Sequence, residues 1–549
     1  MATSVLPAPP SLPAPPSARP PVLHRPPARP AAVAADDDPY RHKYLIAVAV
    51  TLAAVLELID TSIVNVAIPH MMGNLGATID EITWVSVGYI VANVIVIPMS
   101  GWLSAYFGRT RYLAGSIALF VVASFFCGAS TSLGMLVGWR VVQGIGGGAL
   151  LSTAQSTLFE AFPPHEVAIG QAMFGIGVMV GPTIGPTLGG WITDHYNWPW
   201  IFYINVPLGI IAFFMVIAYV RDSAHQARAR TIDGTGIFLL ALCVGALQWM
   251  LERGERHDWF ESRFIVTLAL TSLVAGVLLI WRELTIDEPI IDFRILKSRQ
   301  LAAGVAFAAA LGLSLYGGIF VLPIFLQQLH ALSASQTGFL MLPGAIASAF
   351  VMGAMSRLRG RIDARYTITA GSFVFLLSMW LLSRLTLESG SHELFWPLIL
   401  RGLGLGLIFV PLTNASMADL HPRDLAQGTG LFNLMRQLGG SMGIAAMATL
   451  LGRWTSAQRS ILTEHIGATD PMTLDRLEKL SAGAVAHGTP SFQAKAQAAA
   501  LLARQIGAQA SVLGFSRVYL LNGILLVCAL PLLLVWRTGR ARGSVGAMH

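Results

Sequence analysis

Charged residues are scarce in this sequence. Only 12% of its 549 residues are Asp, Glu, Lys or Arg, whereas 54% are hydrophobic, and the mean hydropathy is +0.63. This apolar content exceeds what the core of a soluble protein needs, so the composition predicts a polytopic membrane protein. The net charge of +7 does not indicate a nucleic-acid partner, because most arginines lie in short connections between apolar runs, where they orient a membrane protein.

Cysteine and lysine are rarer still. The three cysteines, Cys127, Cys243 and Cys528, lie within apolar runs without metal-ligand spacing, so neither a disulfide framework nor a metal site is expected. None of the four lysines follows a glycine, so the chain has no phosphate-binding loop of the GxxxxGKS or GxxxxGKT type. Uphill work must therefore draw on a proton or ion gradient, or on an ATPase of another chain. We expect no bound cofactor.

The first forty residues lack any apolar run. They are rich in proline and alanine and end in the acidic stretch "DDD", which predicts a disordered tail over 1–42. A cleavable signal peptide is not expected, because no apolar segment precedes Arg41. Residues 537–549 are predicted to form a second short tail.

Apolar segments of about 20 residues recur from Lys43 onward, and each can cross a hydrocarbon core of about 30 Å. We predict fourteen spans, the first over 44–68 and the last over 516–536. Arginines fall in alternate loops, which places both termini in the cytoplasm by the positive-inside rule. The loop "ERGERHDWFESR" is an exception, because its arginines lie on the opposite side together with four acidic residues.

A repeat in two loops divides the spans. "GWLSAYFGRTR" and "GAMSRLRGRIDAR" share two glycines seven residues apart, with an arginine after the second. Each loop follows the second span of its half if two spans are treated as an insertion. The predicted fold is an all-α membrane protein of two six-helix bundles around a central pathway. Its parts are an N-terminal bundle over 43–221, two inserted helices with linkers over 222–299, and a C-terminal bundle over 300–536 that includes an outer loop over 452–515.

Away from the ends of the predicted spans, the charged residues are Glu57, Asp60, Arg140, Arg401 and Arg436. A charge in the middle of a span costs at least about 2.5–3.5 kcal/mol, so each invites a functional explanation. Counted from the outer ends of their spans, Asp60 and Arg140 both lie roughly 9–14 Å deep, and they could meet. Either they form a buried pair that holds two helices together, or protonation of Asp60 or Glu57 couples proton movement to a change of shape.

The fifth span carries both kinds of helix breaker in "GIGVMVGPTIGPTLGG". Its glycines recur every four residues and so form one flat stripe, which allows a second helix to approach closely. The prolines bend the helix. The stripe is either a fixed contact or a sliding seal. Its residues are Gly177, Gly181, Pro182, Gly185, Pro186, Gly189 and Gly190.

These motifs resemble the major facilitator superfamily, and within it the fourteen-span drug:proton antiporters of the EmrB/QacA type. The resemblance covers about residues 43–540 and rests on "LIDTSIVNVAIP", "GWLSAYFGRTR", "RVVQGIGGGA", "GPTIGPTLGG", "WIFYINVPLG" and "NLMRQLGGSMG". It implies proton-driven efflux of lipophilic or amphipathic drugs by alternating access across the bacterial inner membrane. It also implies that the protein is a carrier and not an enzyme. A membrane enzyme is disfavoured independently, because no nucleophile, base and oxyanion-donor grouping stands out among the spans.

The loop between the second and third spans keeps Gly101, Gly108, Arg109 and Arg111 of the family's motif. It departs from the motif at Ala105, where relatives commonly have an acidic residue. The charge relay attributed to this loop is therefore in doubt here. The arginines could instead serve only to fix the topology.

The sequence suggests candidate residues for a substrate cavity, several substrate classes and a protein partner. Candidate cavity residues are Asn65, Tyr89, Gln143, Arg401, Asn433 and Arg436. A lipophilic cation would suit the acidic residues, whereas an organic anion such as a fatty acid or an uncoupler would suit the arginines, and a dedicated metabolite exporter would share every motif. EmrB-like transporters work with a periplasmic adaptor and an outer-membrane channel. The outer loop over 452–515, with helical patterning near 471–482 and 492–508, is expected to help dock such an adaptor.

Overall fold

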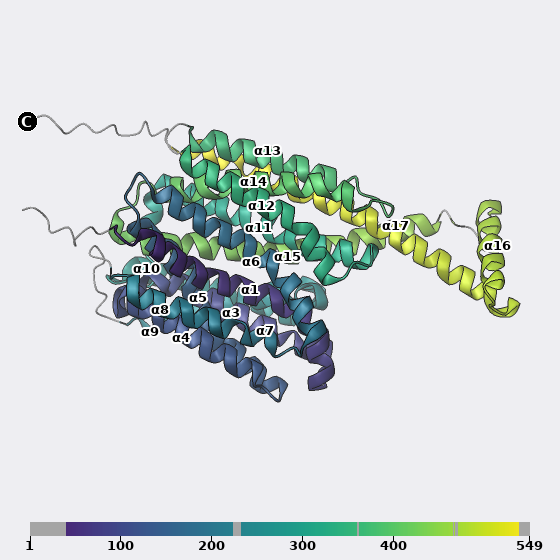
Figure 1. Cartoon of the computed structure of the whole chain (residues 1–549), viewed down its shortest axis with the longest axis horizontal. Coiled ribbons are helices and arrows are strands. Elements are labelled where there is room, and N and C mark those ends of the chain that lie inside the picture. The colour runs from purple at the N-terminus through teal and green to yellow at the C-terminus, as the bar shows by residue number, and fades with distance from the viewer. Residues whose placement is uncertain (1–39, 223–231, 359–361, 465, 467–469, 537–549) are drawn as a thin grey trace, which may run out of the picture. The chain divides into compact units, whose positions relative to one another are not determined.

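A computed structural model describes residues 40–222, 232–358, 362–464, 466 and 470–536 (Figure 1). The described residues from His42 onward form one compact unit. Regular structure in the described residues is helical throughout. The predicted tails lie outside these residues, apart from residues 40–42.

The long helices follow the predicted spans closely. In the N-terminal half they are α1 (Lys43–Leu75), α3 (Trp84–Phe107), α4 (Arg109–Gly128), α5 (Leu133–Ala161), α6 (Val167–His195) and α8 (Asn205–Tyr219), the last preceded by the short α7 (Trp200–Tyr203). The inserted pair is α9 (Gly234–Arg253) and α10 (Arg263–Thr285). The C-terminal half contains α11 (Arg299–Leu329), α12 (Ala334–Arg357), α13 (Ala364–Leu382), α14 (Ser391–Met417), α15 (Leu425–Glu464), α16 (Pro471–Ala486) and α17 (Ser491–Cys528).

Twelve helical segments among the described residues are long and apolar enough to cross a membrane. Two further helices, α5 and α15, are 29 and 40 residues long. They are less hydrophobic because they carry Arg140 and Arg436 together with many glycines and hydroxyl residues. They pack inside the two halves of the molecule. With α5 and α15, the helices match the fourteen that the sequence predicts.

The pairing of helices repeats in the two halves. The first helix of each half packs on the fifth (α1 on α6, α11 on α15), and the second packs on the fourth (α3 on α5, α12 on α14). The third contacts the fourth and the sixth (α4 on α5 and α8, α13 on α14 and α17). The halves meet where the fifth helix of one packs on the second helix of the other, α6 on α12 and α15 on α3. This is the arrangement of two repeated six-helix bundles that the sequence predicts.

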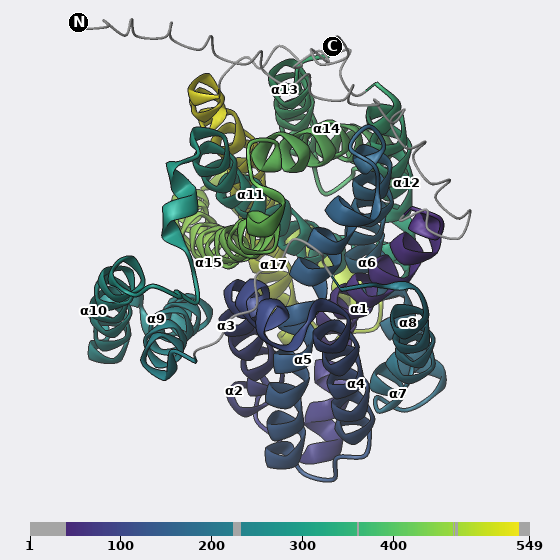
Figure 2. The ribbon, with the colours of Figure 1, turned by 90° about the vertical axis from the view of Figure 1, so that its left-hand side faces the viewer.

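The inserted helices α9 and α10 pack on each other beside the two bundles (Figure 2). Trp249 of α9 meets Trp84 of α3 edge to face, with ring centroids 5.0 Å apart. The side-chain amide of Gln248 donates to the Ser441 hydroxyl of α15 at 2.9 Å. The inserted pair therefore contacts both bundles through α9.

The described residues of the predicted outer segment over 452–515 are mainly helical, and helices cover both stretches with predicted helical patterning, near 471–482 and 492–508. Helix α15 continues to Glu464, and α17 begins at Ser491 and runs without interruption into the last span. The physical reason is composition, because the chain from Phe492 to Cys528 contains no proline and is rich in strong helix formers. The short α16 packs on α17, and Figure 1 shows it at the far end of α17, away from the other helices.

Candidate functional site

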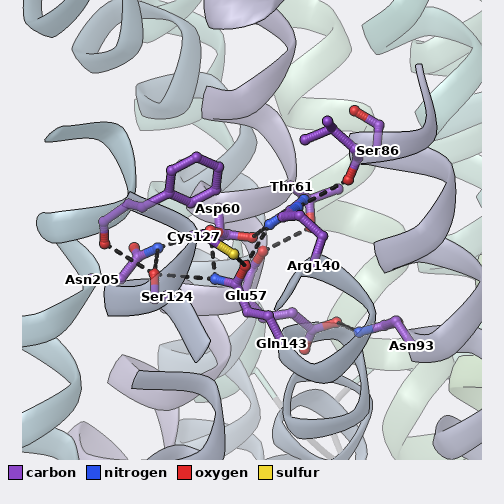
Figure 3. A network of polar contacts seen from close by, with 12 residues as sticks. Glu57, Asp60, Thr61, Ser86, Asn93, Ser124, Cys127, Arg140, Gln143 and Asn205 are labelled. Atoms are coloured by element: carbon purple, nitrogen blue, oxygen red, sulfur yellow. Dashed lines mark hydrogen bonds and ion pairs between the residues drawn. The ribbon is translucent and has the colours of Figure 1, made fainter. Parts of the chain in front are cut away.

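Asp60 and Arg140 meet in the N-terminal bundle. Arg140 of α5 donates from Nη1 to Oδ2 of Asp60 of α1 at 2.5 Å, and both side chains are buried. The Arg140 Nε–H also donates to the Val85 carbonyl oxygen of α3 at 3.0 Å. The pair therefore joins three helices at one point, as Figure 3 shows.

Neutral side chains complete the shell around Asp60. Its Oδ1 accepts hydrogen bonds from the side-chain amides of Gln143, at 2.9 Å, and Asn205, at 2.8 Å. Both amides also contact the Ser124 hydroxyl, which donates to the Phe202 carbonyl oxygen. Both carboxylate oxygens thus accept hydrogen bonds, an arrangement that suits the ionised acid.

Aromatic rings enclose the guanidinium of Arg140. The Tyr89 ring centroid lies 4.2 Å from the guanidinium carbon, and that of Phe202 lies 5.6 Å away. Such contacts are attractive, and more so where water is excluded. The pair is therefore enclosed by protein side chains.

Glu57 lies one helical turn before Asp60, with a different set of neighbours. It is 5% exposed, and its Oε1 accepts a hydrogen bond from the Asn93 amide at 2.9 Å. Its Oε2 is buried without a hydrogen-bond partner. Glu57 therefore keeps an acceptor free, whereas both oxygens of Asp60 are engaged.

A polar group connects the two bundles near Glu57. The Asn433 amide of α15 donates to the Gln155 side-chain oxygen of α5 at 2.6 Å. Arg436, also on α15, donates from Nη2 to the Asn433 side-chain oxygen at 3.1 Å. Arg436 is fully buried, and its Nε and Nη1 have no partner.

Arg401 lies within the C-terminal half. It lines a cavity of about 30 Å³ together with Thr183 of α6 and Ser348 of α12. Its Nη1 and the Ser348 hydroxyl are buried without a partner.

The candidate cavity residues do not gather in one place. Gln143 and Tyr89 surround Arg140, Asn433 and Arg436 lie between the bundles, Arg401 is separate, and Asn65 is exposed.

The glycine stripe of α6 faces α1, the helix that carries both buried carboxylates. A Cβ atom added at Gly181 would lie 2.9 Å from Leu58 Cβ, and one at Gly185 would lie 1.8 Å from Ser62 Oγ. Gly177 and Gly189 make the same kind of approach to α1, and Gly190 is also buried. Pro182 and Pro186 lie inside α6 and are half-buried.

The loop between α3 and α4 contains a buried ion pair. Gly108 has a φ of +87°, a backbone conformation that favours glycine. The next residue, Arg109, is 3% exposed and donates to Glu160 of α5 at 2.5 Å. Arg109 is thus part of a structural contact and not only a determinant of topology. Arg111 is exposed.

Two acidic residues lie at this loop although Ala105 replaces the expected one. Glu160 pairs with Arg109, and the Asp222 carboxylate accepts a hydrogen bond from the Thr110 backbone N–H at 2.9 Å. Gly101 allows close packing, because a Cβ there would lie 3.0 Å from the backbone at Ala426. The corresponding loop of the C-terminal half falls partly at 359–361, outside the described residues.

The sequence indicated that Asp60 and Arg140 could meet. It did not identify the other side chains around Asp60 or the acidic residues at the loop between α3 and α4. Asn205 could have been identified as a candidate site residue, because it is the only amide in the motif "WIFYINVPLG". Ser124 carries no such signal, because serine is common in apolar spans. Glu160 and Asp222 are distant in sequence from the loop that they contact, so spacing does not reveal them.

Comparisons with known proteins identify the family of this chain. The sequence profile of the Major Facilitator Superfamily matches residues 50–444. Multidrug export protein EmrB of Escherichia coli strain K12 is 34% identical over 495 residues, which cover 90% of this chain and 94% of EmrB. Fatty acid resistance protein FarB of Neisseria gonorrhoeae is 31% identical over 500 residues, which cover 91% and 96% of the two chains.

A solved structure shows the same fold. The human organic anion transporter MFSD10 superposes with a TM-score of 0.56 at 13% identity, covering 88% of this chain and 99% of MFSD10. The fold and the family profile define a membrane carrier with many transmembrane helices. The chain belongs to the major facilitator superfamily and, within it, to the family of EmrB-type transporters.

Proposed function

We propose that this protein exports lipophilic or amphipathic compounds across the bacterial inner membrane in exchange for protons, by alternating access. The relatives named for multidrug export and for fatty acid resistance support efflux of toxic compounds. The substrate undergoes no chemical reaction, and the proton gradient takes the place of a cofactor.

The buried group around Asp60 carries the proposal of proton coupling. Protonating Asp60 removes the charge that compensates Arg140, and an uncompensated buried charge costs about 3–5 kcal/mol. The hydrogen bonds from Arg140, Gln143 and Asn205 must then rearrange, which affects α1, α5 and α8 together. Protonation therefore has a structural consequence at a point where helices of the N-terminal bundle meet.

Helix α6 provides a route from this group to the other bundle. One side of α6 packs on α1 through the glycine stripe, and α6 also packs on α12. A shift of α1 that follows protonation of Asp60 would displace α6 at the interface of the two bundles. This supports the sliding interpretation of the stripe.

Transport in proteoliposomes with an imposed pH gradient tests the proposal. Asp60→Asn keeps the size of the side chain but cannot ionise, so we expect it to abolish uphill transport while the protein remains folded and inserted. The matched control is Asn74→Ala, an exposed residue near the end of the same helix. Full gradient-driven transport by Asp60→Asn would disprove the assignment of Asp60 as the coupling residue.

We further propose that the outer segment formed by the end of α15, by α16 and by the start of α17 docks a periplasmic adaptor that leads to an outer-membrane channel. Deleting residues 472–508 tests this. Gly514 approaches Thr455, since a Cβ there would lie 2.5 Å from Thr455 Oγ1, so the shortened α17 would begin near the retained end of α15. We expect transport in proteoliposomes to persist and drug resistance in cells to be lost. Adaptor co-purification with the deleted protein would refute docking at this segment.

A further inference from the structure

The inserted helix α9 lies at the seam where α3 of one bundle packs on α15 of the other, and it contacts both (Figure 2). Near one end of the seam α3 and α15 touch directly, because a Cβ at Gly430 would lie 3.4 Å from the Ile97 carbonyl oxygen. Trp84 and Ser441, which α9 contacts, lie 13 residues before Ile97 and 11 residues after Gly430. At 1.5 Å per residue, both lie about 17–20 Å toward the side that the loop charges predict to be outer. Helix α9 therefore joins the outer halves of the bundles.

On the side of α3, aromatic, polar and apolar contacts hold α9 together. Besides the edge-to-face contact of the two tryptophans, the guanidinium carbon of Arg253 lies 5.4 Å from the Trp84 ring centroid, and its Nη2 donates to Thr83 Oγ1 at 3.2 Å. A Cβ at Gly245 would lie 3.8 Å from Val91 Cγ1, an ordinary van der Waals distance. These contacts hold α9 along about two turns of α3.

On the side of α15, two hydrogen bonds between side chains join α9 and the loop after it to the C-terminal bundle. The Gln248 amide donates to Ser441 Oγ at 2.9 Å, and the Trp259 indole N–H donates to Thr449 Oγ1 at 3.0 Å. We call these two hydrogen bonds the outer latch. Gln248 is fully buried, so its hydrogen bond offsets the cost of burying an amide. Hydrogen bonds of this kind are individually weak, so they can break and reform.

An unusual turn directs Trp259 toward α15. Asp258 and Trp259 have φ values of 51° and 53°, a left-handed conformation that is unfavourable for a residue as large as tryptophan. The Trp259 backbone N–H donates to the Gly254 carbonyl oxygen at 2.8 Å, and a Cβ at Gly254 would lie 2.6 Å from the Trp259 ring. Strain of this kind persists where surrounding contacts require it, and it is concentrated at functional and switch regions. The turn therefore holds the indole in place for Thr449.

The two sides of α9 differ in how easily they can separate. The contacts with α3 are several and of different kinds, whereas the outer latch consists of two hydrogen bonds. We propose that the inserted pair moves with the N-terminal bundle and that the outer latch breaks and reforms in each transport cycle. Gln248 and Trp259 are then positioning residues, which hold α15 against the N-terminal bundle in the state of the structure. This inference rests on the proposed alternating access and assigns a role to the inserted helices.

Cross-linking in proteoliposomes tests which contact must open. The three native cysteines are first replaced with alanine. Gly245→Cys with Val91→Cys then joins α9 to α3, and Gln248→Cys with Ser441→Cys joins α9 to α15. A short bis-methanethiosulfonate reagent links each pair, and dithiothreitol removes the link. Ethidium and 1-naphthoate, a lipophilic cation and a lipophilic anion, serve as transport probes, so the result does not depend on the charge of the substrate.

We expect the link between α9 and α3 to leave at least half of the transport rate. The link between α9 and α15 should lower the rate at least tenfold until dithiothreitol is added. Each variant before linking is its own control. Undiminished transport with the link to α15, or an equal loss with the link to α3, would overturn the proposal. If the unlinked cysteine-free protein transports neither probe under a pH gradient, the proposed export fails, and distance measurements test the latch separately.

Distances between spin labels follow the same motion without a transport substrate. Labels at the exposed positions Asn74, Glu261 and Glu393 report on the N-terminal bundle, on the loop after α9 and on the C-terminal bundle. Between low and high pH, the distance from Glu261 to Asn74 should stay constant, whereas the distance from Glu261 to Glu393 should shift by several ångströms. A shift of the first distance or a constant second distance would contradict the proposal.

A single substitution tests the latch itself. Thr449→Val removes the hydroxyl that accepts from the Trp259 indole but keeps a β-branched side chain. It should raise at least twofold the fraction of molecules that show the released distance from Glu261 to Glu393. The matched control is Thr463→Val, at an exposed position on the same helix, which should leave the distribution of distances unchanged. Identical distributions in Thr449→Val and in the wild-type protein would show that this hydrogen bond does not hold the bundles.

Discussion

The two bundles share one pattern of helix pairing but use it differently. In each bundle the fourth helix carries a buried arginine, Arg140 on α5 and Arg401 on α14. The N-terminal bundle pairs Arg140 with the Asp60 carboxylate and the Gln143 amide oxygen, whereas Arg401 forms no salt bridge with a carboxylate among the described residues. One repeated fold therefore holds a paired arginine in one half and an arginine without a salt-bridge partner in the other.

Removing each arginine in turn gives the largest expected difference. Arg140→Gln leaves Asp60 buried without its counter-charge and should destabilise the folded protein by about 3–5 kcal/mol. Arg401→Gln removes a cation that has no partner, so the melting temperature without substrate should stay the same or rise. Thermal unfolding in detergent measures both.

The double variant Asp60→Asn with Arg140→Gln provides the control for this prediction. It removes both charges and should recover part of the stability that Arg140→Gln loses. An equal loss of stability in Arg140→Gln and Arg401→Gln would contradict the view that only the N-terminal arginine is compensated.

The fifth helices offer a second comparison, because each packs through glycines on the first helix of its bundle. In α15 a Cβ at Gly439 would lie 2.1 Å from the Ala309 carbonyl oxygen, which is backbone, whereas in α6 a Cβ at Gly181 would meet the Leu58 side chain at 2.9 Å. We therefore expect Gly439→Ala to destabilise by about 3 kcal/mol and Gly181→Ala by nearer 1 kcal/mol.

Larger substitutions connect this packing to turnover. Gly181→Leu and Gly185→Leu should block transport, because α6 can then no longer approach α1. The control is Gly483→Ala in α16, where an added Cβ meets nothing within 4 Å. Normal transport by both leucine variants would show that the stripe is not a seal that the cycle uses.

The smallest effect is expected at the loops. Arg109→Gln breaks the buried pair with Glu160 and should cost about 1.5 kcal/mol, the lower end for a charged hydrogen bond. Arg357, from the corresponding region of the C-terminal half, is exposed, so Arg357→Gln should change the stability by less than about 0.5 kcal/mol. Equal melting temperatures for the two variants would show that the N-terminal pair does not stabilise the fold.

Much of the fold could be predicted from the sequence because a membrane constrains a chain strongly. Apolar runs of spanning length must be helices, and their number and loop repeat define two bundles. The similar depths of Asp60 and Arg140 allowed them to meet, and the structure brings them into contact. Depth and periodicity describe one helix at a time, however, so they could not reveal which helix the glycine stripe contacts.

Sites formed between distant segments were the least predictable. Asn205 is 145 residues from Asp60, and Glu160 is 51 residues from Arg109. No local pattern connects such residues. That neither Arg401 nor Arg436 forms a salt bridge with a carboxylate among the described residues likewise emerges only when the helices are packed. Among the candidate cavity residues, Gln143 and Tyr89 contact Arg140, whereas Arg401 lines a separate small cavity.

The unbroken α15 and α17 have a mechanical consequence. A helix of 40 residues is about 60 Å long, roughly twice the thickness of the hydrocarbon core. Such a rod acts as a lever, so each degree of rotation about a point about 30 Å away moves its tip by about 0.5 Å. Because α15 also contains Arg436, a rotation of the helix that displaces Arg436 would also displace the outer end of α15. A partner bound to α16 would restrain this motion and slow transport without contacting the transport pathway.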